Sequence, residues 1–183
     1  SRGIRSFPPE VLTAGMKRAH DAGWQVAVHA NGDAAIDMVL DAYASIIRST
    51  PRQDHRHRIE HCSIAWDEHF AKMAELGVTP SFLIGHVHYW GRVFRDRIFG
   101  PKKAARLDAT ASATRAGVRY SVHSDFDVTE IAPLRCIENT VTRVMRDGGE
   151  VLAPEECVPV DEALRAMTIN AAWQARMDHA VGS

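Results

Sequence analysis

The sequence predicts an α/β fold built on a parallel sheet. Four short apolar segments with strand character alternate with longer segments in which apolar residues recur at helical spacing. Three of the strands directly follow a glycine that ends a helix, at Gly23, Gly77 and Gly117, where a left-handed glycine returns the chain into a strand. Four strands are half the number in a closed parallel barrel, so the pattern fits a small open sheet or half of a barrel.

Local patterns define the individual elements. Prolines at positions 8 and 9 favour a helix start, and Asp33 and Asp67 are the expected N-caps of two later helices. Pro80 is unusual for a central strand, and the segment 86–100, rich in aromatic residues, is expected to be a long loop. The predicted strands are 24–29, 57–64, 78–86 and 118–125, and the predicted helices are 8–23, 33–48, 67–77, 102–117, 134–145 and 161–176.

Composition excludes several classes of protein. The chain has 183 residues, 45% hydrophobic and 25% charged, which suits one globular domain. A formal net charge of -1 gives no overall attraction to nucleic acid or anionic membranes, and no apolar run reaches the roughly 20 residues that span a bilayer. The three cysteines lack CxxC spacing, so we expect a reducing, cytoplasmic location without disulfides. Phosphate-binding glycine loops and serine nucleophile motifs are absent from the sequence.

Polar residues with metal-binding chemistry mark the ends of the predicted strands. His29, His61, His86, His123 and Asp125 each lie at such an end. Because the carboxyl ends of parallel strands meet at one edge, we expect these side chains to lie close together. Imidazoles and carboxylates from separate strands are typical ligands of Zn²⁺ or a similar divalent ion.

Each of these residues also has a structural interpretation. A single histidine at a strand end can simply bond to the backbone, and Asp125 can serve as a turn or capping residue. Tyr89 and Trp90 fit either a substrate pocket or the packing of a long loop. The histidines on polar loops and helices are assigned to the surface: His20, His55, His57, His69 and His179.

Five motifs in order resemble the amidohydrolase superfamily, most closely its N-substituted formamide deformylase-like branch (amidohydrolase family 3). They are "HANGDAAIDMVLDA", "HRIEHCSI", "GHVHYWG", "GVRYSVHSD" and "EALRAMTINAAWQA", and they cover nearly the whole chain. The resemblance implies that the chain is the C-terminal half, strands five to eight with their helices, of a TIM-like (β/α)8 barrel. The β-sandwich portion and the first-strand His-x-His are absent, so residues 1–183 are expected to be part of a longer protein.

The resemblance also implies roles for the strand-end residues. His29, His61 and Asp125 would bind one or two divalent ions, most simply Zn²⁺, and Asp125 would transfer the proton of an activated water. His86, Tyr89, Trp90 and His123 would contact the substrate, with His61 or His86 stabilising the oxyanion. The implied function is hydrolysis of amide-type C–N bonds.

The chain alone is expected to be inactive and to bind metal weakly, because part of the family's metal site is missing. The alternative is a non-catalytic half-barrel that binds a small molecule or assembles with another chain. Two open sheet edges favour a homo-oligomer. The expected partner is a small amide-type molecule, with no nucleic acid and no membrane.

Overall fold

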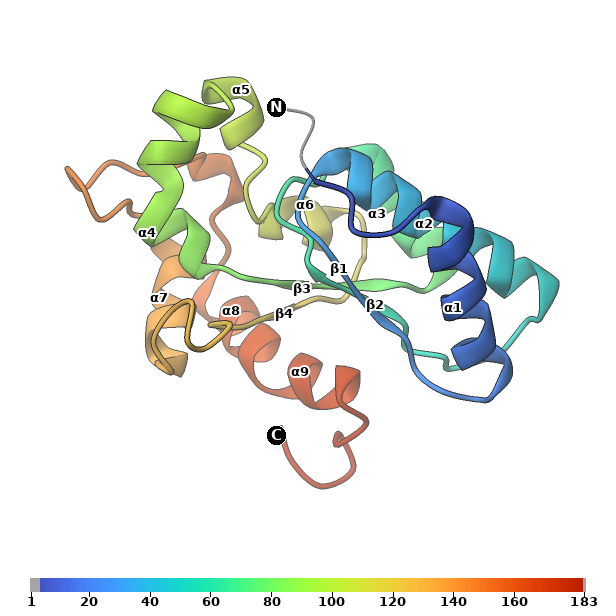
Figure 1. Cartoon of the computed structure of the whole chain (residues 1–183). Coiled ribbons are helices and arrows are strands. Elements are labelled where there is room, and N and C mark those ends of the chain that lie inside the picture. Colours follow the sequence, from blue (N-terminus) through green and yellow to red (C-terminus); the bar gives the residue numbers. More distant parts are fainter. Residues whose placement is uncertain (1–3, 183) are drawn as a thin grey trace.

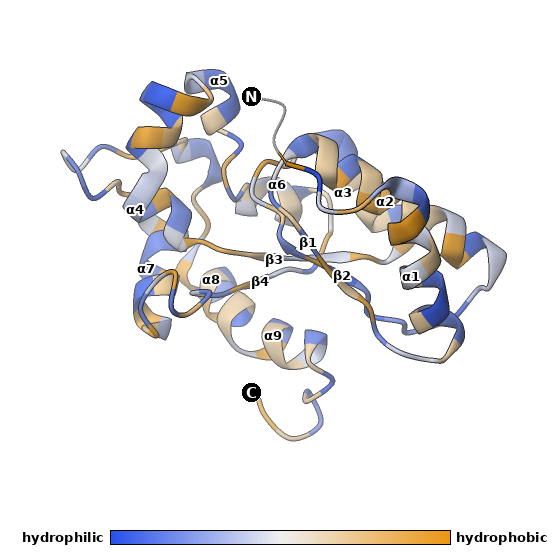
Figure 2. Cartoon of the chain, in the orientation of Figure 1, coloured by the Kyte–Doolittle hydropathy of each residue, from blue (hydrophilic) through white to orange (hydrophobic). Residues whose placement is uncertain are grey.

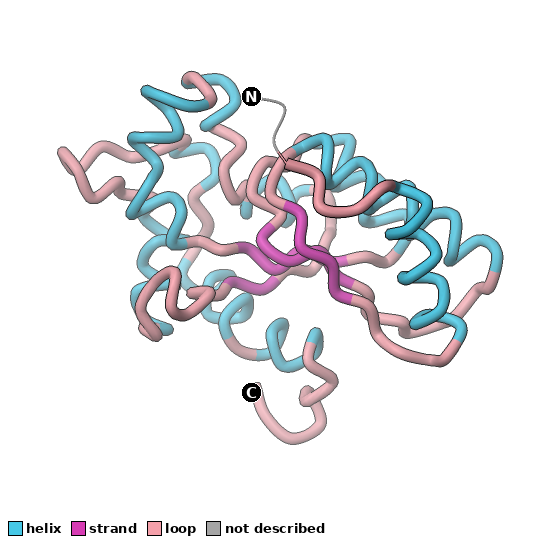
Figure 3. The backbone as a smooth tube through the Cα atoms, in the orientation of Figure 1, coloured by secondary structure: helices cyan, strands magenta, loops and turns pink. Residues whose placement is uncertain are grey.

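A four-stranded parallel sheet lies at the centre of the computed structural model, which describes residues 4–182 (Figure 1). The strands stand side by side in chain order, so β1 and β4 are the outer strands of this sheet. Neighbouring strands pair in parallel throughout, and their carboxyl ends therefore point the same way. Figure 3 shows the strands together at the centre of the molecule, with helices around them. The strands are β1 (Ala27–Ala30), β2 (Arg58–His61), β3 (Thr79–Phe82) and β4 (Ser121–Val122).

Helices connect successive strands and cover the sheet. Helix α2 packs against α1, α3 and β1, whereas α8 and α9 lie against β4 (Figure 1). The helices of the described residues are α1 (Pro9–Asp21), α2 (Asp33–Ser49), α3 (Asp67–Leu76), α4 (Gly85–Val93), the π-helix η1 (Phe94–Ile98), α5 (Pro101–Ala104), α6 (Thr110–Arg115), α7 (Pro133–Thr142), the 3-10 helix η2 (Pro154–Glu156), α8 (Val160–Met167) and α9 (Ile169–Gln174).

The two faces of the sheet differ in chemistry. Ile59, Phe82 and Val122 face the helices and are fully or almost fully buried, and Figure 2 shows apolar residues concentrated in the strands and along parts of the helices. On the other face, Ser81 and Ser121 pair in register, and their hydroxyl oxygens lie 3.0 Å apart. This alternation gives the sheet one apolar and one polar side. The polar side is covered in part by Gln174 of α9, which accepts from the Ser121 hydroxyl and donates to Thr79 Oγ1 at 3.0 Å.

Glycine closes helices as expected. Gly23, Gly77 and Gly117 have φ of 83°, 66° and 69°, in the left-handed region that glycine adopts without strain. The expected N-caps are wrong by one residue, because Gly32 and Trp66 occupy the cap positions. Asp33 is instead the first residue of α2, where its carboxylate accepts from the Ala34 N–H at 3.0 Å and pairs with Lys103 at 2.6 Å.

The expected loop 86–100 is wrong, because the chain there forms α4 and η1. Glycine in this segment serves close packing. A Cβ on Gly85 would stand 2.7 Å from the Thr129 methyl group, and one on Gly91 would stand 3.0 Å from Met145. Pro80 does lie in a central strand, but β4 pairs with β3 only from Ser81 onward, so no β4 residue is paired with the proline.

Four histidines assigned to the surface are buried. The exposed fractions are 2% for His20, 7% for His55, 0% for His57 and 3% for His69, and His179 is exposed as expected. Their neighbours in the sequence are polar, which favoured a surface position. The burial arises from packing between segments that are distant in the chain.

The α/β class and the parallel sheet are confirmed. Among the helices described, none is both long and apolar enough to cross a membrane.

Candidate metal centre

The carboxyl ends of β2 and β4 carry the residues of the candidate site. His61 is the last residue of β2, and His123 and Asp125 follow directly after β4. Both His61 and Asp125 have left-handed backbone conformations, with φ of 68° and 50°. Such conformations strain a non-glycine residue by about 1–3 kcal/mol and concentrate at functional sites.

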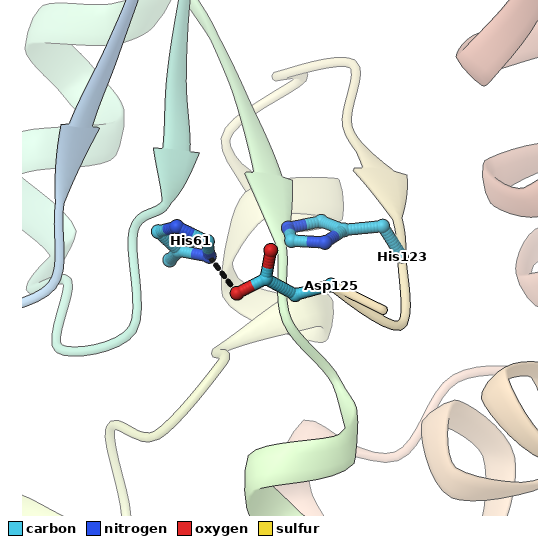
Figure 4. A group of neighbouring side chains, drawn as sticks. All are labelled: His61, His123 and Asp125. Carbon is cyan, nitrogen blue, oxygen red and sulfur yellow. Dashed lines mark ion pairs between the residues drawn. The ribbon is translucent and has the colours of Figure 1, made fainter. Parts of the chain in front are cut away.

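The three side chains converge on one point (Figure 4). His61 Nδ1 lies 3.9 Å from Asp125 Oδ2, and the His61 and His123 ring centroids are 5.2 Å apart. Each residue offers one ligand atom, and these atoms all lie within 4.8 Å of one another. Two imidazoles and a carboxylate at this separation are a suitable donor set for a divalent ion such as Zn²⁺.

The His61 ring supplies direct evidence that this group fits a cation. Its Nδ1 is buried and has no hydrogen-bond partner among the described residues. Buried polar atoms almost always have a partner, so an unpartnered one requires a reason. A metal ion between His61 and Asp125 would provide the missing partner for Nδ1.

His123 has the hydrogen bond expected of a metal-binding histidine. Its Nε2 lies 3.2 Å from the backbone oxygen of Ser81, which can only accept, so Nε2 carries the proton. A neutral His123 then presents a free lone pair at Nδ1. Metal-bound histidines usually donate their other ring N–H to a carbonyl or carboxylate in this way.

Burial keeps the histidines of this region neutral. It lowers the pKa of His61, with further contributions from the His123 and His29 rings, and it lowers the pKa of His123. Burial, followed by the His61 ring, lowers the pKa of His86 to about 4. Neutral imidazoles are the metal-binding form, so these side chains can act as ligands near neutral pH without first losing a proton.

His29 lies beside this group but outside it. Its ring centroid is 4.5 Å from that of His61, and its side chain is exposed on the outer strand β1. Its Nε2 lies 3.3 Å from the side-chain nitrogen of Asn31, which donates to it. His29 is therefore close enough to join a metal site, but in this structure its Nε2 lone pair is engaged.

Three of the four residues expected to contact substrate come from α4, which begins three residues after β3 ends. His86 and Trp90 are in edge contact, with ring centroids 5.7 Å apart, and both are half-buried. The Tyr89 hydroxyl donates to Glu130 Oε1 at 3.2 Å, which ties α4 to the segment that follows Asp125. The substrate-binding roles of His86, Tyr89 and Trp90 stay predictions, as does that of His123, whose position beside His61 and Asp125 fits a metal ligand better.

Sequence reasoning missed two polar residues at this edge. Ser63 Oγ lies 2.8 Å from Asn31 Oδ1 and 3.1 Å from His86 Nδ1. Each of these two residues stands two positions after a strand-end histidine, Asn31 after His29 and Ser63 after His61. That shared offset was the available signal in the sequence.

Comparisons with known proteins decide the family. The family model described as "Amidohydrolase family" matches residues 2–183. The chain belongs to the amidohydrolase family. This confirms the resemblance that the sequence motifs indicated, and membership supports a metal-dependent hydrolase.

Individual relatives agree with this assignment. An N-substituted formamide deformylase from Arthrobacter pascens is 36% identical over 155 residues, which are 85% of this chain and 28% of that protein. The protein LONG AFTER FAR-RED 3 from Arabidopsis thaliana is 29% identical over 99% of this chain and 31% of its own length. The chain thus spans about a third of the length of these curated relatives.

A solved structure shares the fold. A metal-dependent hydrolase from Pyrococcus furiosus, itself described as uncharacterized, matches all of this chain and 36% of its own chain, with a TM-score of 0.81 and 23% identity. At this level of identity the likeness shows the fold alone.

Proposed function

We propose that this chain is part of a metal-dependent hydrolase that cleaves amide-type C–N bonds, with His61, His123 and Asp125 as ligands of the metal. The observation that carries the proposal is the buried, unpartnered Nδ1 of His61, which lies 3.9 Å from the Asp125 carboxylate. Family membership supplies independent support for this class of chemistry.

In this proposal the four strands correspond to the fifth to eighth strands of a (β/α)8 barrel. The support is the uninterrupted parallel order β1-β2-β3-β4, in which helices connect the strands. A closed barrel leaves no strand edge, whereas β1 and β4 each have one unpaired edge among the described residues. The same open edges support association with further barrel strands or with a second copy.

Zinc is the proposed ion because two imidazoles and one carboxylate make up a common catalytic zinc set, with a further position left for water or substrate. When bound, the ion would supply a water of lowered pKa and polarisation of the substrate carbonyl. His29 can extend the set, for one ion or two, if its Nε2 leaves Asn31. The chain alone is proposed to be inactive and to bind the ion weakly.

Asp125 has the position required of a proton carrier. About 39% of its side chain is exposed, so the carboxylate is accessible to solvent and substrate while it faces His61. Its proposed role is to accept a proton from the attacking water and to deliver it to the leaving nitrogen. The left-handed backbone at Asp125 fixes the direction of this carboxylate relative to β4.

The proposed substrate is a small amide. The name of the Arthrobacter relative, N-substituted formamide deformylase, supports this class. Trp90 and Tyr89 on α4 offer aromatic surface beside His86 at the same end of the sheet. Aromatic walls with a few convergent polar groups are typical of small-molecule sites.

The Asp125→Asn variant tests the proposal in the intact protein. Asparagine keeps the shape of the side chain but cannot take up the proton, so kcat should fall about 10²–10⁴-fold. Turnover on an amide substrate is measured together with thermal stability and bound metal.

The matched control is Asp127→Asn, two residues away on the exposed side of the same turn. It should keep near-normal turnover. If Asp125→Asn retains its metal and its turnover, the assignment of Asp125 is wrong. If turnover and metal disappear together, Asp125 acts mainly as a ligand.

A further inference from the structure

A hydrogen-bonded chain of side chains links three successive loops at the carboxyl edge of the sheet. Asn31 follows β1, Ser63 follows β2, and His86 stands at the start of α4 after β3. The Ser63 hydroxyl, on a residue only 4% exposed, contacts both of the others, at 2.8 Å from Asn31 Oδ1 and 3.1 Å from His86 Nδ1.

Backbone contacts hold this chain in place. The Ile64 N–H donates to the Asn31 carbonyl oxygen at 2.9 Å, and the Asp108 N–H donates to the Ser63 carbonyl oxygen at 2.8 Å. The His86 N–H donates to the Leu83 carbonyl oxygen at 3.0 Å, so the backbone is held at Ser63 and at both of its partners. Ser63 is only 4% exposed, so its hydroxyl has little access to competing water.

The direction of each hydrogen bond follows from counting protons. A serine hydroxyl has one proton, and Asn31 Oδ1 can only accept, so the Ser63 proton points to Asn31. Toward His86, the Ser63 oxygen is then left to accept. His86 Nδ1 must supply that proton, which leaves the Nε2 of a neutral His86 with a free lone pair.

We propose that Ser63 is a positioning residue that fixes the Nδ1–H tautomer of His86, so that His86 Nε2 accepts a hydrogen bond from an N–H of the substrate. This deepens the proposed function and rests on it for the substrate. It also replaces the expected oxyanion role of His86, because a neutral Nε2 without a proton cannot donate to an oxyanion.

A hydrogen-bond acceptor at His86 Nε2 would select among amide substrates. An amide that carries one substituent on nitrogen still has an N–H to offer to Nε2. An amide with two substituents has none and would leave a half-buried acceptor without a partner. The site should therefore favour N-monosubstituted amides over their N,N-disubstituted counterparts.

Nitrogen-15 NMR of the 183-residue chain tests the tautomer without any need for activity. The protonated and unprotonated nitrogens of a neutral imidazole have well-separated shifts, and the His86 signals are identified by their loss in His86→Gln. We expect Nδ1–H in the wild type, conversion to Nε2–H or a mixture in Ser63→Ala, and the wild-type form in Ser63→Thr, which keeps the hydroxyl.

Ser121→Ala is the matched control. It removes another buried hydroxyl, 4% exposed, whose contacts are Ser81 and Gln174 and not His86. An Nε2–H tautomer in the wild type would overturn the proposal. So would an unchanged tautomer in Ser63→Ala, or an equal change in Ser121→Ala.

The substrate arm uses a matched pair of amides, N-methyl and N,N-dimethyl, on the intact protein. A neutral hydrogen bond contributes roughly 0.5–1.5 kcal/mol, so Ser63→Ala should reduce the preference in kcat/KM for the N-methyl amide by up to about tenfold. An unchanged preference would overturn the acceptor role of His86. Absence of any amide turnover would count against the proposed function, while the NMR result would still decide the tautomer.

Discussion

Histidines gather at both ends of the sheet, and the two groups differ in what their ring nitrogens bind. The amino-end cluster consists of His20, His55 and His57, next to the starts of β1 and β2. The carboxyl-end cluster consists of His61, His86 and His123. Both are largely buried, yet only the second has a buried ring nitrogen without a hydrogen-bond partner among the described residues.

Every ring nitrogen of the amino-end cluster is engaged. The Val26 N–H donates to His57 Nδ1 at 3.0 Å, so His57 carries its proton on Nε2 and donates it to His20 Nδ1 at 2.8 Å. His20 in turn donates from Nε2 to the carbonyl oxygen of Thr50 at 2.7 Å.

His55 completes the same pattern. Its Nδ1 accepts from the backbone N–H of His57 at 3.0 Å, and its Nε2 donates to the carbonyl oxygen of Leu76 at 3.0 Å. In each of the three rings Nε2 therefore donates and Nδ1 accepts, so no nitrogen lone pair is left to bind a metal. The surface is hollowed beside His55, Leu76 and Trp173, but the histidine nitrogens there are all hydrogen-bonded, and the two carboxylates that line the hollow, Asp54 and Glu75, are paired with arginines.

The difference shows that the availability of a lone pair, rather than the number of histidines, distinguishes a structural cluster from a ligand cluster. At the amino end the backbone determines every tautomer and stabilises the fold. At the carboxyl end the backbone orients His123 through Ser81 and leaves nitrogens of His61 and His123 free.

The largest expected effect is a contrast in stability between two equivalent substitutions. His57→Ala removes a fully buried ring and leaves the Val26 N–H and His20 Nδ1 without partners, so the free energy of unfolding should fall by about 3 kcal/mol or more. His61→Ala loses packing but also removes an unpartnered buried nitrogen, so the change should stay below about 1 kcal/mol.

Urea unfolding of both variants measures this contrast directly. Equal losses of stability would show that the two clusters are structurally equivalent, and the distinction between them would fail.

The dependence of stability on pH is a smaller effect with a defined sign. Burial, then the neighbouring His55 and His20, lower the pKa of His57 from 6.5 to about 3. Between these values the unfolded chain binds more protons than the folded one, so the His57 contribution is complete above pH 6.5 and is lost as the pH falls toward 3. The free energy of unfolding should decrease by up to about 1.4 kcal/mol per pH unit from this group.

His57→Gln removes that titrating group and should flatten the slope over this range. His179→Ala, on an exposed residue, serves as the control and should leave the slope unchanged. A His57→Gln slope equal to that of the wild type would mean that His57 titrates normally in the folded protein.

Much of the carboxyl-end cluster could be predicted from sequence. The rule that parallel strands bring their carboxyl ends to one edge predicts that His61, His123 and Asp125 lie close together, and their ligand atoms lie within 4.8 Å of one another. The rule requires only strand assignments, and the metal-binding roles expected for His29, His61 and Asp125 stay predictions. The glycines at 23, 77 and 117 marked the helix ends for an equally local reason.

Rules that use only neighbouring residues in the sequence could not predict the amino-end cluster. His55 and His57 sit among charged residues in "RQDHRHRIE", which resembles a surface loop. Their burial depends on His20, which is 37 residues before His57 and belongs to α1. The helix α4 was missed for a similar reason, since Gly91 packs against Met145, far along the chain.

Zinc titration by calorimetry on the 183-residue chain tests whether His61 and His123 bind the metal, with His61→Ala, His123→Ala and His57→Gln measured beside the wild type. We expect weak binding of one ion per chain. In His61→Ala and His123→Ala the zinc affinity should fall by more than about 10–100-fold, which is the loss typical when a residue that supports a metal ligand is removed. Folded His57→Gln should keep the zinc affinity of the wild type. Zinc affinity that survives in His61→Ala and His123→Ala but is lost in His57→Gln would contradict a metal-binding role for His61 and His123.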